Sequence, residues 1–159
     1  MNTRVYVETS VVSYLSAQPS RDLVLAAHQQ VTRDWWSRRS RFELFVSDAV
    51  LAECGRGDPE AAARRLKAIE GISVLRATPA AESLAKQFLL SSAISSRAVI
   101  DAAHVAIATT QGMDFLVTWN CTHIANATIR EKIEDVCRRA GFRPPVICTP
   151  LELTLEEEP

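Results

Sequence analysis

The sequence predicts an α/β fold with a central parallel sheet, and two patterns support this prediction. Short runs rich in β-branched residues alternate with longer segments whose apolar residues recur at helical spacing, as βαβ units require. Strands are expected at residues 4–7, 42–46, 73–75, 115–118 and 146–148. Helices are expected at residues 9–15, 20–39, 59–70, 96–111 and 125–140, with two more that begin after Ser47 or Asp48 and after Thr78.

In the first half of the chain, polar residues and a proline set the boundaries of the elements. The strand at residues 4–7 stops at Glu8, and Pro19 separates a short helix from a longer one that Ser20 can cap. The inward face of the longer helix is expected to carry Leu23, Ala27, Val31 and Trp35.

From residue 58 onward, capping residues followed by proline mark helix starts, and glycines mark helix ends. Asp58-Pro59 and Thr78-Pro79 each place a capping side chain before a proline of the first turn. Gly71 and Gly112 can adopt the left-handed conformation that ends a helix. A serine at position 95 or 96 is expected to start the helix that runs to residue 111.

The composition is that of an ordinary globular protein. Of 159 residues, 47% are hydrophobic and 23% are charged, which suffices for one core, and the net charge of −1 gives no global sign of nucleic-acid binding. No signal peptide is expected, and no apolar run approaches the ~20 residues of a membrane span. The four cysteines lack the spacing of a disulfide or zinc framework, so we expect reduced thiols and a cytoplasmic location.

Near the carboxyl end, Thr149 and Glu152 have the spacing of a capping box for a terminal turn. No repeat and no low-complexity linker divides the sequence. We therefore expect one domain over residues 1–153, followed by a disordered acidic tail at residues 154–159.

Acidic side chains fall where a parallel sheet binds ligands. Glu8 follows the first strand and Asn120 closely follows the fourth, and ligands of open parallel sheets bind outside the carboxyl ends of the strands. Glu53 borders the apolar face of its helix. Asp101 lies among apolar residues, with His104 on the same helical face. A carboxylate in apolar surroundings must be paired, protonated or bound to a cation, and Mg²⁺ or Mn²⁺ prefers such hard oxygen ligands.

Four stretches of the chain carry a family pattern: residues 5–11 (VYVETSV), 47–53 (SDAVLAE), 101–108 (DAAHVAIA) and 116–120 (LVTWN). In their order, spacing and structural context, they resemble the PIN-domain family, and within it the VapC-type toxin ribonucleases of bacterial toxin–antitoxin pairs. The resemblance covers nearly the whole chain.

This resemblance implies a three-layer α/β/α sandwich and a Mg²⁺- or Mn²⁺-dependent site that hydrolyses single-stranded RNA. Similar toxins are homodimers silenced by a small antitoxin, so RNA, an antitoxin and a second copy of the chain are the expected partners. The candidate catalytic residues are Glu8, Glu53, Asp101 and Asn120, of which the three acids would hold the metal. The auxiliary polar residues are Thr9, Thr118 and His104.

Two positions depart from the family pattern. Glu8 stands where Asp is usual, and Asn120 stands where an acid is usual, so it offers an oxygen without a charge. Both departures lower the expected metal affinity, because a longer side chain moves the carboxylate and an amide removes a charge. The alternative function is therefore a catalytically weakened PIN-like module that binds RNA or a partner protein.

Each candidate residue also has a purely structural interpretation. Glu8 can cap the helix that follows it, and Asp101 can be a stabilising acid of a first helical turn. Glu53 can pair with Arg56 in solvent, and His104 can be a histidine at the edge of the core that bonds to the backbone.

Two other doubly wound enzyme classes fit less well. A phosphatase of the haloacid-dehalogenase type needs an Asp nucleophile at the first strand end, where this chain has Glu8-Thr9-Ser10. Dinucleotide binding of the Rossmann type is excluded, because no glycine-rich turn follows the first strand.

Overall fold

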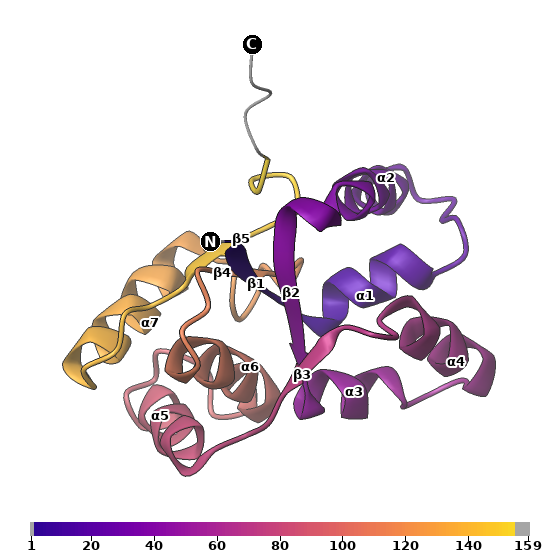
Figure 1. Cartoon of the computed structure of the whole chain (residues 1–159). Helices are drawn as coiled ribbons and strands as arrows, with labels where there is room; N and C mark the ends of the chain where they lie inside the picture. The colour runs from indigo at the N-terminus through magenta and orange to yellow at the C-terminus, as the bar shows by residue number, and fades with distance from the viewer. Residues whose placement is uncertain (1, 155–159) are drawn as a thin grey trace.

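The computed structural model describes residues 2–154 and contains a five-stranded sheet at its centre (Figure 1). The strands are β1 (Thr3–Val7), β2 (Phe42–Ser47), β3 (Ser73–Leu75), β4 (Phe115–Val117) and β5 (Val146–Cys148). Their order is β3-β2-β1-β4-β5, and every neighbouring pair is parallel. The carboxyl ends of β1, β2 and β4 therefore lie side by side at one edge of the sheet.

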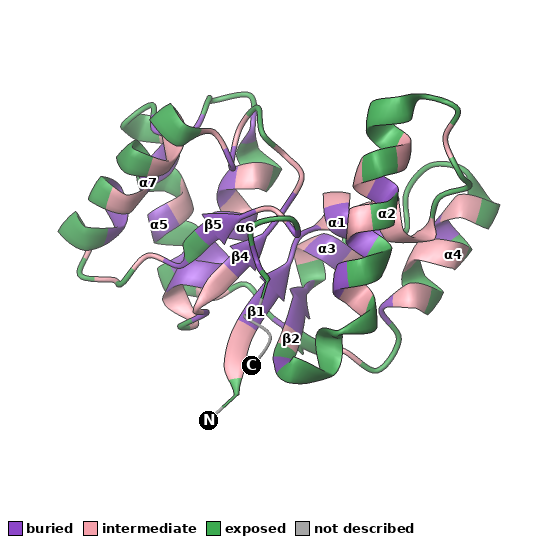
Figure 2. Cartoon of the chain, turned by 90° about the horizontal axis from the view of Figure 1, so that it is seen from above, coloured by how far each residue is buried: buried purple, intermediate pink, exposed green. Residues whose placement is uncertain are grey.

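Helices flank this sheet on both sides (Figures 1 and 2). One group of packed helices consists of α1 (Thr9–Ser16), α2 (Leu23–Ser37), α3 (Asp48–Cys54) and α4 (Pro59–Ala68). The other consists of α5 (Pro79–Leu90), α6 (Val99–Thr110) and α7 (Ala127–Arg139), while the short 3-10 turn η1 (Arg39–Arg41) links α2 to β2. The predicted α/β/α fold with a parallel sheet is confirmed, and so are all five predicted strands.

Capping side chains start most of the helices where the sequence predicts them. Ser47 accepts a hydrogen bond from the Val50 amide, Asp58 from the Ala61 amide, and Thr78 from the Ala81 amide. Each of these bonds satisfies one of the amides that a helix start leaves without a partner within the helix.

Three predicted helix starts are too early, and one of them is that of α7, which begins at Ala127 rather than at residue 125. Helix α2 is capped by Asp22, which accepts from the Leu25 amide at 2.9 Å, while Ser20 instead accepts from the Asp22 amide. Helix α6 begins at Val99, because residues 95–98 form a separate turn closed by the Ala98 amide and the carbonyl of residue 95 at 2.8 Å. Asp101 consequently lies in the first turn of α6.

The predicted inward face of α2 is also partly wrong. Leu23 is 86% exposed and Ala27 is exposed, whereas Gln29 and Thr32 are buried. The helix is turned so that these two polar side chains make hydrogen bonds with other parts of the chain, among them the bond from the Trp119 indole to Thr32 at 2.8 Å. Polar partners, which apolar periodicity does not detect, decide this orientation.

The core lies between the sheet and the two groups of helices, and Figure 2 shows the strands as mostly buried. Within residues 2–154, we find no helix that is long and apolar enough to cross a membrane. The predicted terminal turn is present, since Glu152 accepts from the Thr149 amide at 3.1 Å. Of the predicted acidic tail, residues 155–159 lie outside the described part of the chain.

Candidate metal centre

Glu8 occupies the junction between β1 and α1. It is the N-cap of α1, as its structural interpretation predicted. Glu8 is only 4% exposed, so this capping residue is buried. Its Oε2 accepts hydrogen bonds from the Ser10 amide at 2.9 Å, from the Thr118 hydroxyl at 2.8 Å, and from the Ser10 hydroxyl. These donors come from two adjacent strand ends, and they hold a buried carboxylate in a fixed position.

Glu53 approaches the same place from α3. Its Oε1 accepts hydrogen bonds from the Thr9 hydroxyl at 2.7 Å and from His104 Nε2 at 2.5 Å. Burial alone would raise the pKa of Glu53, but these two hydrogen bonds, together with the charge interactions with His104 and Arg56, hold the pKa below its usual value. Arg56, the partner expected from the sequence, makes only a smaller contribution in the same direction.

His104 is fully buried and links Glu53 to the core. Its Nδ1 lies 2.6 Å from the Tyr6 hydroxyl, which lies 2.7 Å from the Ser47 hydroxyl. An ionised Glu53 only accepts hydrogen bonds, so His104 donates from Nε2. In a neutral imidazole Nδ1 then accepts, so Tyr6 donates to it and accepts from Ser47. This chain from Ser47 through Tyr6 and His104 to Glu53, called here the buried relay, fixes the rotamer of the carboxylate.

Both carboxylates keep one oxygen available. Each uses a single oxygen for its hydrogen bonds, so Glu8 Oε1 and Glu53 Oε2 accept none from the residues that the structure describes. One potential ligand atom from each of Glu8, Glu53 and His104 lies within 4.8 Å of the other two. Because both nitrogens of His104 already have partners, Glu8 and Glu53 are the members of this group whose carboxylates could hold a hard divalent cation.

Asp101 lies close enough to Glu53 and His104 to interact with their charges, but it is not part of the group of three whose ligand atoms lie within 4.8 Å of one another. Burial raises the pKa of Asp101 above its usual value, and this outweighs the opposing hydrogen bond from Asn120. Glu53 also raises that pKa, which shows that the two carboxylates are electrostatically coupled. A bound cation would favour the ionised form of Asp101 and would so oppose the effect of burial.

Asn120 holds the loop after β4. Its Oδ1 accepts from the His123 amide at 3.0 Å, which leaves the amide nitrogen as the group that faces Asp101. The sequence suggested that this oxygen could serve a metal directly or through water. In the structure this oxygen accepts one hydrogen bond and keeps a second lone pair, while the Asn120 side chain also hydrogen-bonds Asp101 and lowers its pKa.

The predicted site residues thus fall into two adjacent groups. Glu8, Glu53, Thr9, Thr118 and His104 form one hydrogen-bonded cluster, and Asp101 with Asn120 borders it. The sequence analysis missed three members, which are Ser10, Tyr6 and Ser47. Ser10 could have been found from its position two residues after a helix-capping acid. A tyrosine inside an apolar strand gives no such signal.

The chain was compared with known proteins. No protein-family model matches it, and no curated protein matches it. Among solved structures, it is similar to that of Mycobacterium tuberculosis VapC20, described as a toxin that cleaves the sarcin-ricin loop, with a TM-score of 0.56. The two are 20% identical, and the match covers 74% of this chain and 91% of that one. At this identity the similarity establishes a common fold, which is the PIN-like arrangement that the sequence predicted.

Proposed function

We propose that this chain is a divalent-metal-dependent endoribonuclease that hydrolyses phosphodiester bonds of single-stranded RNA. One observation carries the proposal: Glu8 and Glu53 each have one oxygen fixed by the protein and one oxygen left for a ligand, at the carboxyl end of the central strand. Fixed carboxylates with free oxygens are what a Mg²⁺ or Mn²⁺ site requires. The fold similarity to an RNA-cleaving toxin supports the same assignment.

The residues of the site have distinct roles in this proposal. Glu8, Glu53 and Asp101 hold the cation, which supplies positive charge at the phosphodiester and lowers the pKa of water when it is bound. Thr118 keeps Glu8 in place through its 2.8 Å hydrogen bond, and Thr9 keeps Glu53 in place at 2.7 Å. His104 orients Glu53, and Asn120 orients Asp101.

The biological setting follows by analogy with VapC-type toxins. We infer that the chain is one PIN-like domain over residues 1–153 and the toxin of a bacterial toxin–antitoxin pair. It would act on RNA in the cytoplasm as a homodimer, and a small antitoxin would inhibit it. Co-expression with the product of an adjacent short reading frame, followed by co-purification, tests the antitoxin part.

The test of the activity is cleavage of a labelled single-stranded RNA with Mn²⁺, Mg²⁺ or EDTA. We expect cleavage only with a cation, and a loss of at least 100-fold in Asp101→Asn and Glu8→Gln. Matched controls are Asp135→Asn and Glu60→Gln, which remove exposed carboxylates on α7 and α4. Equal activity of Asp101→Asn and the parent chain would exclude this site.

Asn120 favours a second candidate, the weakened binding module. Its side chain carries no charge, and its oxygen already accepts one hydrogen bond, from the His123 amide. Isothermal titration calorimetry separates the two functions. A chain that binds RNA but binds no Mn²⁺ at millimolar concentration is a module, whereas the nuclease binds Mn²⁺, and Asp101→Asn weakens that binding.

A further inference from the structure

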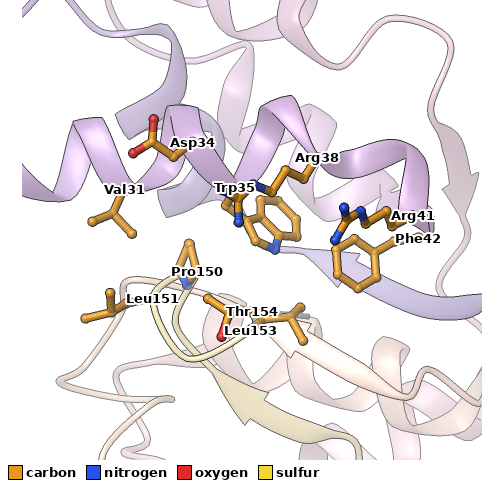
Figure 3. A pocket seen from close by; sticks show the side chains of 10 residues that line it. All are labelled: Val31, Asp34, Trp35, Arg38, Arg41, Phe42, Pro150, Leu151, Leu153 and Thr154. Carbon is orange, nitrogen blue, oxygen red and sulfur yellow. The ribbon is translucent and has the colours of Figure 1, made fainter. Parts of the chain in front are cut away.

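A pocket separates the carboxyl-terminal half of α2 from the turn at residues 150–154 (Figure 3). Its volume is about 210 Å³, and Trp35, Phe42, Leu151 and Leu153 supply much of its apolar wall. A cavity of about 150 Å³ lined by apolar side chains is known to hold benzene. This pocket therefore has room for one ring with a short polar extension.

One residue of the pocket wall, Trp35, carries a buried donor without an acceptor among residues 2–154. Trp35 is 5% exposed, and its Nε1 is enclosed without a hydrogen-bond partner in the described part of the chain. Figure 3 shows the indole extending from α2 with its nitrogen toward the turn at residues 150–154. Leaving such a buried donor unpaired is unfavourable, so an acceptor that reaches it is favoured.

The charges around the pocket favour an anion. Arg38 and Arg41 line it, and neither makes an ion pair with a carboxylate of residues 2–154. Asp34 lies on the same wall, where its Oδ1 already accepts from Gln30 at 2.8 Å. Two guanidinium groups against one carboxylate leave a net positive charge, and guanidinium binds carboxylates in a bidentate manner.

We propose that this pocket binds a small organic acid with an apolar body. The carboxylate accepts from Trp35 Nε1 and pairs with Arg38 and Arg41, while the apolar body contacts Phe42 and Leu153. Because the indole nitrogen is enclosed, the ligand reaches it as residues 150–154 move outward. This site is separate from the metal centre, so the proposal does not depend on nuclease activity.

The test uses two-dimensional ¹⁵N NMR of the whole chain, which shows the indole N–H signals of Trp35, Trp36 and Trp119. Single Trp→Phe variants assign them. The probes are 3-phenylpropionate, its neutral amide, and 3-phenylpropylamine. We expect the acid to shift the Trp35 indole signal and the amides of residues 151–154, with a dissociation constant of about 1 mM or below.

Variants identify the groups that bind the carboxylate. The double variant Arg38→Gln/Arg41→Gln changes only exposed side chains, and we expect it to bind the acid about tenfold more weakly. Arg33→Gln is the matched control, because Arg33 is an exposed arginine of α2 that bonds to Gln30 and does not line the pocket.

Three outcomes would overturn the proposal. The first is no shift of the Trp35 indole signal with 10 mM acid. The second is binding of the amine or the amide as tight as that of the acid, which would remove the role of the arginines. The third is an equal affinity of the acid for the double variant and for the control.

Discussion

Removing the Tyr6 hydroxyl tests the buried relay. Tyr6 is fully buried, and its hydroxyl is the bridge between His104 Nδ1 at 2.6 Å and Ser47 Oγ at 2.7 Å. Tyr6→Phe keeps the ring and deletes only this bridge. His104 Nδ1 then loses its donor, and the Ser47 hydroxyl loses its acceptor, although Ser47 still accepts from the Val50 amide.

The expected cost follows from these two losses. A buried polar group left without a partner costs roughly 1–3 kcal/mol, so Tyr6→Phe should lower the free energy of unfolding by about 3 kcal/mol. In a chain of this size, that lowers Tm by roughly 6–12 °C. The burial of Tyr6 holds the pKa of its hydroxyl well above its usual range, so the hydroxyl stays protonated across neutral pH.

The assay is urea unfolding followed by circular dichroism, with the midpoint and the slope fitted separately. Tyr14→Phe is the control, because Tyr14 is half-buried and its hydroxyl has no hydrogen-bond partner in the described residues. We expect that control to stay within about 0.5 kcal/mol of the parent chain. If Tyr6→Phe behaves like Tyr14→Phe, the hydroxyl does not bridge the two groups and the relay is refuted.

Three further predictions concern the acids. Glu8→Asp should weaken Mn²⁺ binding about tenfold, because the shorter side chain cannot keep the hydrogen bonds that Oε2 accepts from Ser10 and Thr118. Calorimetry measures this affinity, and tighter Mn²⁺ binding by the variant would contradict the prediction. Asn120→Asp adds a second negative charge beside Asp101, so it should tighten Mn²⁺ binding and lower the Tm measured in EDTA at pH 7. An unchanged Tm would show that residues 101 and 120 do not interact electrostatically. Asp101→Asn should raise Tm in EDTA at pH 7. Burial raises the pKa of Asp101 in the folded state, so ionisation of Asp101 destabilises the fold as pH rises through that pKa. The difference in Tm between Asp101→Asn and the parent chain should therefore vanish below the unfolded-state pKa of about 4.

The strands and most of the helix boundaries could be predicted because they depend on local chemistry. Pro59 and Gly71, for example, restrict or free their own backbone torsions whatever surrounds them. The start of α6 could not be predicted in this way, because several nearby serines compete as caps and none is used. The orientation of α2 depends on partners such as Trp119, which lies far away in the sequence.

The same distinction applies to the candidate site. The positions of Glu8 and Glu53 at a strand end and on a helix border are local features, so the sequence suffices to identify them. Their hydrogen-bond partners are not local: Thr118 is 110 residues from Glu8, and His104 is 51 residues from Glu53. The relay through Tyr6 needs four elements, β1, β2, α3 and α6, to come together, so a buried tyrosine in β1 looks like any other core residue until the fold is known.

The two departures from the family pattern therefore have different physical consequences. The extra methylene of Glu8 lets Oε2 meet the Ser10 amide and the Thr118 hydroxyl, so the longer side chain is held as firmly as a site requires. Asn120 has no comparable compensation among the described residues. Its side chain is uncharged, and its oxygen accepts a hydrogen bond from the His123 amide. Any weakness of metal binding should thus arise on the side of Asp101, where burial already disfavours the ionised carboxylate that a cation needs.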